Sequence, residues 1–185
     1  RIHLGYLLEL LAERGVFGLT SFSFDRDADG LNNNFVEYID GIRLYLENEN
    51  DKENATIQEI RMRFCGFLYH LIRSFSIENR NNLFLRDLRS SLFYLFASWC
   101  YKYSSCFLNY KPTFTSMADI EVSALKAMSA VLCCGSVFDN KCLSEDSPFY
   151  QWVNKLLLSE DENIRILGQE TIVLLLEFNP DSTSL

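Results

Sequence analysis

The clearest cluster of metal-ligating residue types is a run of three alternating aspartates before Gly30, namely Asp25, Asp27 and Asp29. This spacing matches the first half of an EF-hand loop, in which alternating carboxylates coordinate Ca²⁺ and a glycine makes a sharp turn. The second half departs from the pattern, because position 12 falls on Val36 and the nearest glutamate, Glu37, stands one residue late. A slip of one residue rotates a side chain by about 100° around a helix. We therefore expect a solvated loop, with weak cation binding by the three aspartates as an alternative.

Catalytic chemistry has few candidate residues in this chain. The two histidines are His3 and His70, and the sequence contains no nucleophile elbow, no glycine-rich phosphate loop and no HExxH motif. His70 falls beside the apolar stripe of an expected helix, where we interpret it as a structural residue rather than a general base. The sequence thus predicts a protein that is not an enzyme and uses no cofactor.

The cysteine pattern is informative about the compartment. The six residues form no CxxC pair, and they are Cys65, Cys100, Cys106, Cys133, Cys134 and Cys142. Zinc sites usually combine such pairs with histidines, and disulfide frameworks are typical of short secreted chains. The pattern favours buried, reduced thiols and a cytoplasmic location.

A local excess of positive charge contrasts with the formal net charge of −8 and the pI of about 4.8. It consists of six arginines, namely Arg61, Arg63, Arg73, Arg80, Arg86 and Arg89. Within that range the acidic residues are Glu78 and Asp87, so the local net charge is +4. These arginines either line solvated helix faces and pair with acidic loops such as 47–53, or form a basic strip that binds an acidic or phosphorylated partner. The overall acidity argues against a nucleic-acid-binding module.

Apolar residues recur with a helical period through most of the chain, and no segment alternates as a strand would. Helix start signals include a capping box at Thr56 and Glu59, and Ser147 followed by Pro148. We predict an all-α protein with helices over 3–14, 35–48, 57–76, 82–103, 117–134, 148–158 and 162–178. The expected loops are 15–34, which is acidic, Asn-rich and flexible, and 49–56, 104–116 and 135–147. The longest uncharged stretches have 12 residues, too few to cross a bilayer.

The last two expected helices indicate the architecture. Residues 148–158 form an amphipathic helix, an acidic turn follows, and the next helix is apolar almost all round over 172–176. A helix that is apolar on every side must be covered by neighbours on more than one side. This arrangement resembles one HEAT- or armadillo-type repeat, in which helix pairs stack into a solenoid. We predict such an α-solenoid of about seven helices, with a compact non-repeating bundle as the alternative.

Four blocks of the sequence resemble Furry proteins, which are very large cell-morphogenesis scaffolds. They are 35–43 (FVEYIDGIR), 86–99 (RDLRSSLFYLFASW), 125–135 (LKAMSAVLCCG) and 171–181 (TIVLLLEFNPD). The blocks follow one another in order along nearly the whole chain. Departures occur at Ser136, where proline is expected, and at Cys100 and Tyr101, where a small polar pair is expected. The segment 15–34 aligns least well.

The resemblance implies that residues 1–185 are a single helical-repeat segment, excised from a much longer armadillo-like chain. It also implies a scaffold that binds NDR-type kinases and promotes their activation together with Mob coactivators. The associated processes are polarised growth, cell shape and neurite patterning, with microtubules as a further partner and the cytoskeleton, centrosome or cell cortex as locations. The alternatives are a purely structural solenoid spacer, and a weak calcium-binding regulatory module.

Overall fold

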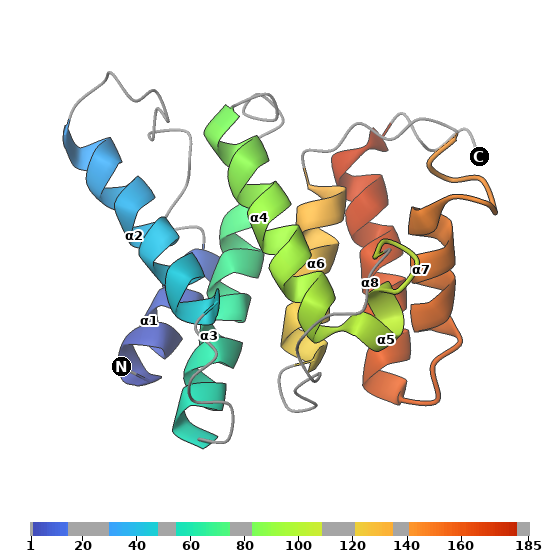
Figure 1. The fold of residues 1–185 in the computed structure, drawn as a ribbon, viewed down its shortest axis with the longest axis horizontal. Helices are drawn as coiled ribbons and strands as arrows, with labels where there is room; N and C mark the ends of the chain where they lie inside the picture. The colour runs from blue at the N-terminus through green and yellow to red at the C-terminus, as the bar shows by residue number, and fades with distance from the viewer. Residues whose placement is uncertain are drawn as a thin grey trace.

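All regular structure in the described part of the chain is helical, which confirms the predicted all-α class. The computed structural model describes residues 2–14, 30–47, 55–74, 83–108, 121–134 and 141–180. Within these ranges it contains eight helices (Figure 1): α1 (Ile2–Glu13), α2 (Gly30–Glu47), α3 (Ala55–Arg73), α4 (Leu83–Trp99), α5 (Tyr101–Ser104), α6 (Glu121–Cys133), α7 (Pro148–Leu157) and α8 (Glu162–Phe178). None of the helices in these ranges is both long enough and apolar enough to cross a membrane.

The helices pack in sequence along the molecule. In Figure 1 the chain progresses from α1 and α2 at the left to α7 and α8 at the right. One row consists of α1, α3, α6 and α8, each in contact with the next. A further helix packs on three of these: α2 on α3, α4 on α6, and α7 on α8. The short α5 links two of these further helices, because it contacts both α4 and α7.

The core runs through the middle of this arrangement and encloses α6 most completely. Its residues Ala124, Leu125, Ala127, Met128 and Ala130 are all fully buried. Their small or unbranched side chains allow α3, α4 and α8 to pack on three sides of one helix. By contrast, α8 exposes part of its apolar surface within this chain. It nevertheless packs against both α6 and α7, so it is covered on more than one side, as expected.

The C-terminal end of α6 is joined to two other helices by polar contacts. Asn179, at the end of α8, donates from Nδ2 to the Cys133 carbonyl at 3.1 Å. Arg89 of α4 donates to the Cys134 carbonyl at 2.7 Å. The last carbonyls of a helix have no partner within it, so these side chains satisfy buried acceptors that would otherwise be costly.

The predicted and observed helix boundaries agree best for α7 and α8. The Ser147 hydroxyl accepts a hydrogen bond from the Tyr150 N–H at 3.1 Å, and Pro148 occupies the first turn, as predicted. Asp161 caps α8 in the same way, accepting from the Asn163 N–H at 2.8 Å.

Three other boundaries differ from the prediction. Helix α2 begins at Gly30, so residues 30–34 are helical rather than part of a loop. Helix α3 begins at Ala55, which places Thr56 in the first turn and not at the N-cap. The single helix expected over 82–103 is interrupted at Cys100, whose φ and ψ of −108° and 36° are not helical. The chain therefore changes direction there, and α5 reaches α7.

Candidate functional site

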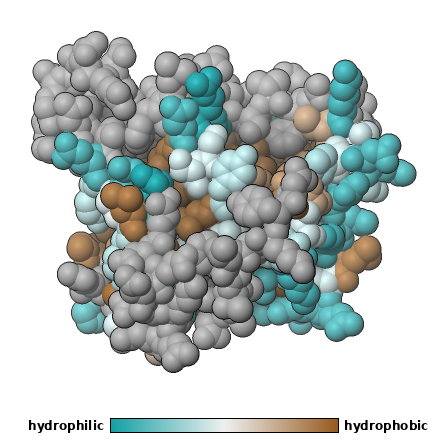
Figure 2. Space-filling view, viewed as in Figure 1, coloured by the Kyte–Doolittle hydropathy of each residue, from teal (hydrophilic) through white to brown (hydrophobic). Residues whose placement is uncertain are grey.

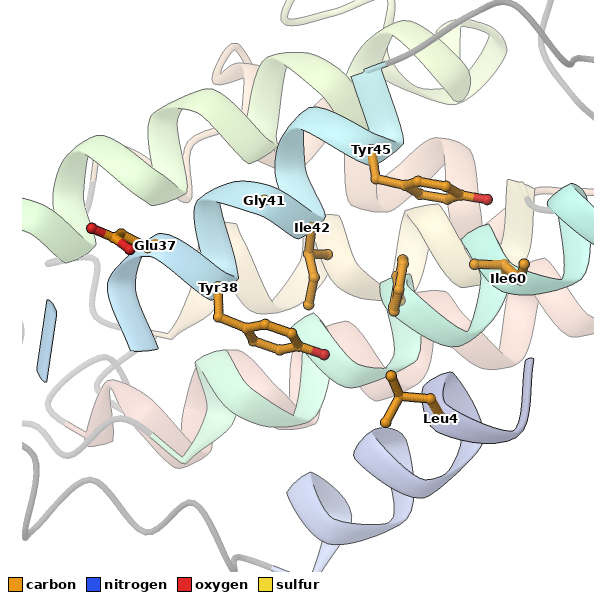
Figure 3. A pocket seen from close by; sticks show the side chains of 8 residues that line it. Leu4, Glu37, Tyr38, Gly41, Ile42, Tyr45 and Ile60 are labelled. Carbon is orange, nitrogen blue, oxygen red and sulfur yellow. The ribbon is translucent and has the colours of Figure 1, made fainter. Parts of the chain in front are cut away.

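An open apolar groove lies between α1, α2 and α3 (Figure 3). It encloses a volume of about 440 Å³. Its lining residues come from all three helices, and they are Leu4, Glu37, Tyr38, Gly41, Ile42, Tyr45, Ile60 and Phe64. Most of these side chains are apolar or aromatic, so the groove suits an apolar ligand group.

Helix α2 contributes most of the groove because its apolar residues share a face. Tyr38, Ile42 and Tyr45 stand at i, i+4 and i+7, which aligns them along one side of a helix. In Figure 3 these side chains point from α2 toward α3 and α1. The Tyr45 ring packs edge-on against Phe64 of α3, with ring centroids 5.5 Å apart at 89°. This contact fixes one end of the groove.

The open edge of the groove is at Gly41. A β-carbon built at this position would find no other atom within 4 Å. The absence of a side chain therefore leaves the α2 backbone accessible beside the aromatic lining.

Charge at the groove is sparse and acidic. Glu37 is exposed at the rim, and its carboxylate points away from the apolar lining in Figure 3. The neighbouring Asp40 is already paired with Arg43, at 2.8 Å. Partial burial raises the pKa of Tyr38, so its hydroxyl stays protonated at neutral pH and can donate a hydrogen bond.

The α1 wall is held against α3 by an ion pair between residues far apart in sequence. Arg63 donates to Glu9 at 3.2 Å and lies 5.1 Å above the Tyr6 ring. The Glu9 carboxylate rests on Gly66, where a β-carbon would lie only 2.0 Å from its Oε1 atom. Any side chain at position 66 would displace Glu9, so Gly66 provides the space for this pair.

The predicted basic strip is not a continuous open surface in the described residues. Arg61 is only 3% exposed. Arg63 is partly covered by its contacts with α1. Arg73 pairs with Glu177 of α8 at 3.1 Å and donates to the Tyr69 hydroxyl at 3.2 Å.

The remaining arginines of the set also have different surroundings. Arg86 is largely exposed, 3.6 Å from Asp87, whereas Arg89 is half-buried through its bond to the Cys134 carbonyl. Arg80 and the acidic loop 47–53 lie outside the described residues, except for the helical Glu47. Several arginines thus connect helices of the chain itself.

The metal prediction falls largely outside the described residues, which do not include Asp25, Asp27 and Asp29. Helix α2 begins at Gly30, where the EF-hand pattern requires a loop turn. Within the ranges that the structure describes, no group of three His, Cys, Asp or Glu residues could hold a metal ion.

The six cysteines and His70 lie in the core or beside it. All six cysteines are described, none forms a disulfide, and Cys65, Cys100, Cys133 and Cys134 are buried. Burial raises the pKa of the Cys134 thiol to about 12, so it stays protonated and unreactive at neutral pH. His70 is half-buried edge-on against Tyr69, and burial lowers its pKa.

Sequence reasoning did not identify the groove. The periodic Tyr38, Ile42 and Tyr45 were a usable signal, because large aromatic residues stand beside Gly41 on one face. The contribution of α1 had no such signal, since it depends on tertiary packing.

The chain matches no protein-family model, and no solved structure matches it.

Proposed function

We propose that this chain is a non-catalytic protein-interaction segment whose contact site is the groove between α1, α2 and α3. The observation that carries the proposal is the open apolar cavity of about 440 Å³ lined by Tyr38, Tyr45 and Phe64. Aromatic residues, and tyrosine in particular, are enriched where proteins bind one another. The titratable groups among the lining residues are Glu37 and the two tyrosines, a set better suited to recognition than to nucleophilic chemistry.

The wider proposal is a segment of a Furry-type scaffold with an armadillo- or HEAT-like solenoid architecture. Its support is the resemblance of the four sequence blocks, together with the ordered packing of α2 on α3, α4 on α6 and α7 on α8. In a solenoid each helix pair contacts mainly its neighbours, as these pairs do. On this proposal the partners are an NDR-type kinase and its Mob coactivator, with microtubules as a further candidate, and the setting is the cytoplasm.

A spacer role is the second candidate, and exposed apolar residues on α8 favour it. Ile166, Val173 and Leu176 are 45%, 63% and 43% exposed. Such a surface suits a further helix pair of a longer solenoid.

A pull-down with purified NDR-type kinase, alone and with its Mob coactivator, tests the proposal. The 185-residue chain should capture the kinase, and filling the groove with Gly41→Trp should abolish capture. Asn154→Trp, on the exposed side of α7, is the control for an added tryptophan. Circular dichroism checks that each variant keeps its helix content.

Charge reversal at Arg86 separates the groove from the basic-strip hypothesis. Arg86 is the suitable residue, because reversal of the buried Arg61 would disturb folding. Loss of kinase capture by Arg86→Glu, with capture by Gly41→Trp intact, would assign docking to the basic surface instead. No capture by the unmodified chain would contradict kinase binding and favour the spacer role.

A further inference from the structure

We propose that the groove binds a basic segment of a partner protein, which inserts a large apolar side chain between α1, α2 and α3 and places a Lys or Arg against Glu37. This inference rests on the proposed interaction function and adds the chemistry of the partner.

The size of the apolar surface favours a polypeptide over a small ligand. The cavity volume of about 440 Å³ lies in the lower part of the roughly 300–1,000 Å³ range of ligand pockets. Apolar surface continues beyond it at Leu7 of α1 and Leu44 of α2, which are 51% and 55% exposed. These leucines follow the lining residues Leu4 and Gly41 by three positions, so each lies near the groove on its helix. An extended apolar surface bordered by polar residues is typical of a protein interaction site.

Figure 2 shows the hydropathy of one face of the molecule. On the side of α1 and α2, hydrophobic surface alternates with hydrophilic residues. A partner that covered this area would need a central apolar anchor and polar groups at its edges, which a peptide segment provides.

The rim charge determines the sign of the partner. Glu37 forms no ion pair with another described residue, whereas Asp40 is neutralised by Arg43. On the α3 side, Glu9 and Glu59 both lie near Arg63, at 3.2 and 3.9 Å. These three residues lie outside the lining, so Glu37 is the one charged side chain among the lining residues that the structure describes, and it gives the groove a negative charge. The net charge of −8 adds a long-range attraction for a basic segment.

The open edge provides access for the backbone of such a segment. Because Gly41 has no side chain and nothing lies within 4 Å of its β-carbon position, a partner chain can lie directly on α2. The Tyr38 side chain is 39% exposed beside it. Its hydroxyl can donate a hydrogen bond to a carbonyl of the bound segment.

Selection from a phage-displayed library of random dodecapeptides, with the full 185-residue chain as bait, tests this chemistry. Enriched peptides should combine a Phe, Trp, Leu or Met with a nearby Lys or Arg. Binding of the selected peptides should weaken at least about tenfold in Gly41→Trp, a ratio that corresponds to about 1.4 kcal/mol. Glu37→Lys should also weaken binding, and the loss should shrink as salt is added.

Two control variants complete the experiment. Asn154→Trp adds the same side chain on the exposed side of α7, and Glu145→Lys makes the same charge reversal in the exposed turn before α7. Both should leave peptide affinity unchanged, and circular dichroism should show helix content equal to that of the unmodified chain.

The outcomes separate this inference from the proposed function. Peptides that lack basic residues and are indifferent to Glu37→Lys, but lose binding in Gly41→Trp, would overturn the inference and leave the groove as the contact site. Peptides whose binding survives Gly41→Trp would overturn both the inference and the groove as the contact site. Failure to enrich any peptide would overturn the inference, whereas failure to capture the kinase bears on the proposed function alone.

Discussion

The contact between α7 and α8 offers a quantitative test, because Gly168 lies where these helices come closest. A β-carbon at position 168 would lie 3.1 Å from the Leu156 β-carbon, from Leu157 Cδ2 and from the Leu157 backbone nitrogen. Two of these atoms belong to or adjoin the α7 backbone, so rotation of a flexible side chain cannot relieve the overlap. Gly168→Ala therefore requires α7 to shift as a unit.

The magnitude follows from two opposing effects. Replacing glycine with alanine inside a helix contributes about 1 kcal/mol of stability, whereas overpacking a core contact costs about 1–3 kcal/mol. The net expectation for Gly168→Ala is a loss of about 1 kcal/mol in the free energy of unfolding. Gly41→Ala is the matched control, because its β-carbon meets nothing within 4 Å. It should gain about 0.5–1 kcal/mol.

Urea unfolding followed by circular dichroism at 222 nm measures both variants. We expect the two free energies of unfolding to differ by about 2 kcal/mol, with Gly168→Ala below and Gly41→Ala above the unmodified chain. If Gly168→Ala is as stabilising as Gly41→Ala, the close approach of α7 and α8 is wrong.

Three further predictions concern buried polar groups and thiols. Burial raises the pKa of Glu121 above its ordinary value of 4.5, so the unmodified chain should lose stability as pH rises through the folded-state pKa. Urea titrations should therefore find Glu121→Gln more stable than the unmodified chain at pH 7, and this difference should vanish below pH 4.5. Equal stabilities at pH 7 would refute this. Asn179→Ala should lower the free energy of unfolding by about 1–3 kcal/mol, because it removes the hydrogen bond that the Asn179 amide donates to the buried Cys133 carbonyl, and an unchanged urea midpoint would contradict that role. A thiol reagent should modify Cys106 and Cys142 in the folded chain and the other four cysteines only in urea; early reaction of more than two thiols would be inconsistent with their burial.

The C-terminal helices could be predicted closely because their local signals are strong. Ser147 and Pro148 begin α7, and an acidic turn separates it from α8, so the boundaries needed no tertiary information. The start of α2 was missed because Gly30 and the asparagines after it are poor helix formers. In the folded chain α2 extends over them, so context overrides local propensity there.

The arginines show that burial can be predicted from the sequence, whereas a partner far away in the sequence cannot. Arg61 stands at the helical positions that precede Cys65, Leu68 and Ile72, all buried, so its own burial was readable from periodicity. The partner of Arg63 was not readable, because Glu9 is 54 residues away and their contact depends on how α1 packs on α3. The α1 wall of the groove could not be predicted for the same reason.

The polar contacts at the end of α6 affect how the molecule comes apart. In many stacked helical proteins the outermost pair frays independently, since little besides apolar surface holds it. Here, separating α8 from α6 would strand the Cys133 carbonyl and would also break the buried contact between the hydroxyls of Ser129 and Thr171, which are 2.8 Å apart. A partial opening therefore loses hydrogen bonds that water cannot replace until the gap is wide. We expect amide protons of α6 and α8 to exchange with solvent at similar rates, because the two helices open as one cooperative unit. Under mechanical load, the C-terminal half of the chain should therefore unfold in one step and not one helix at a time.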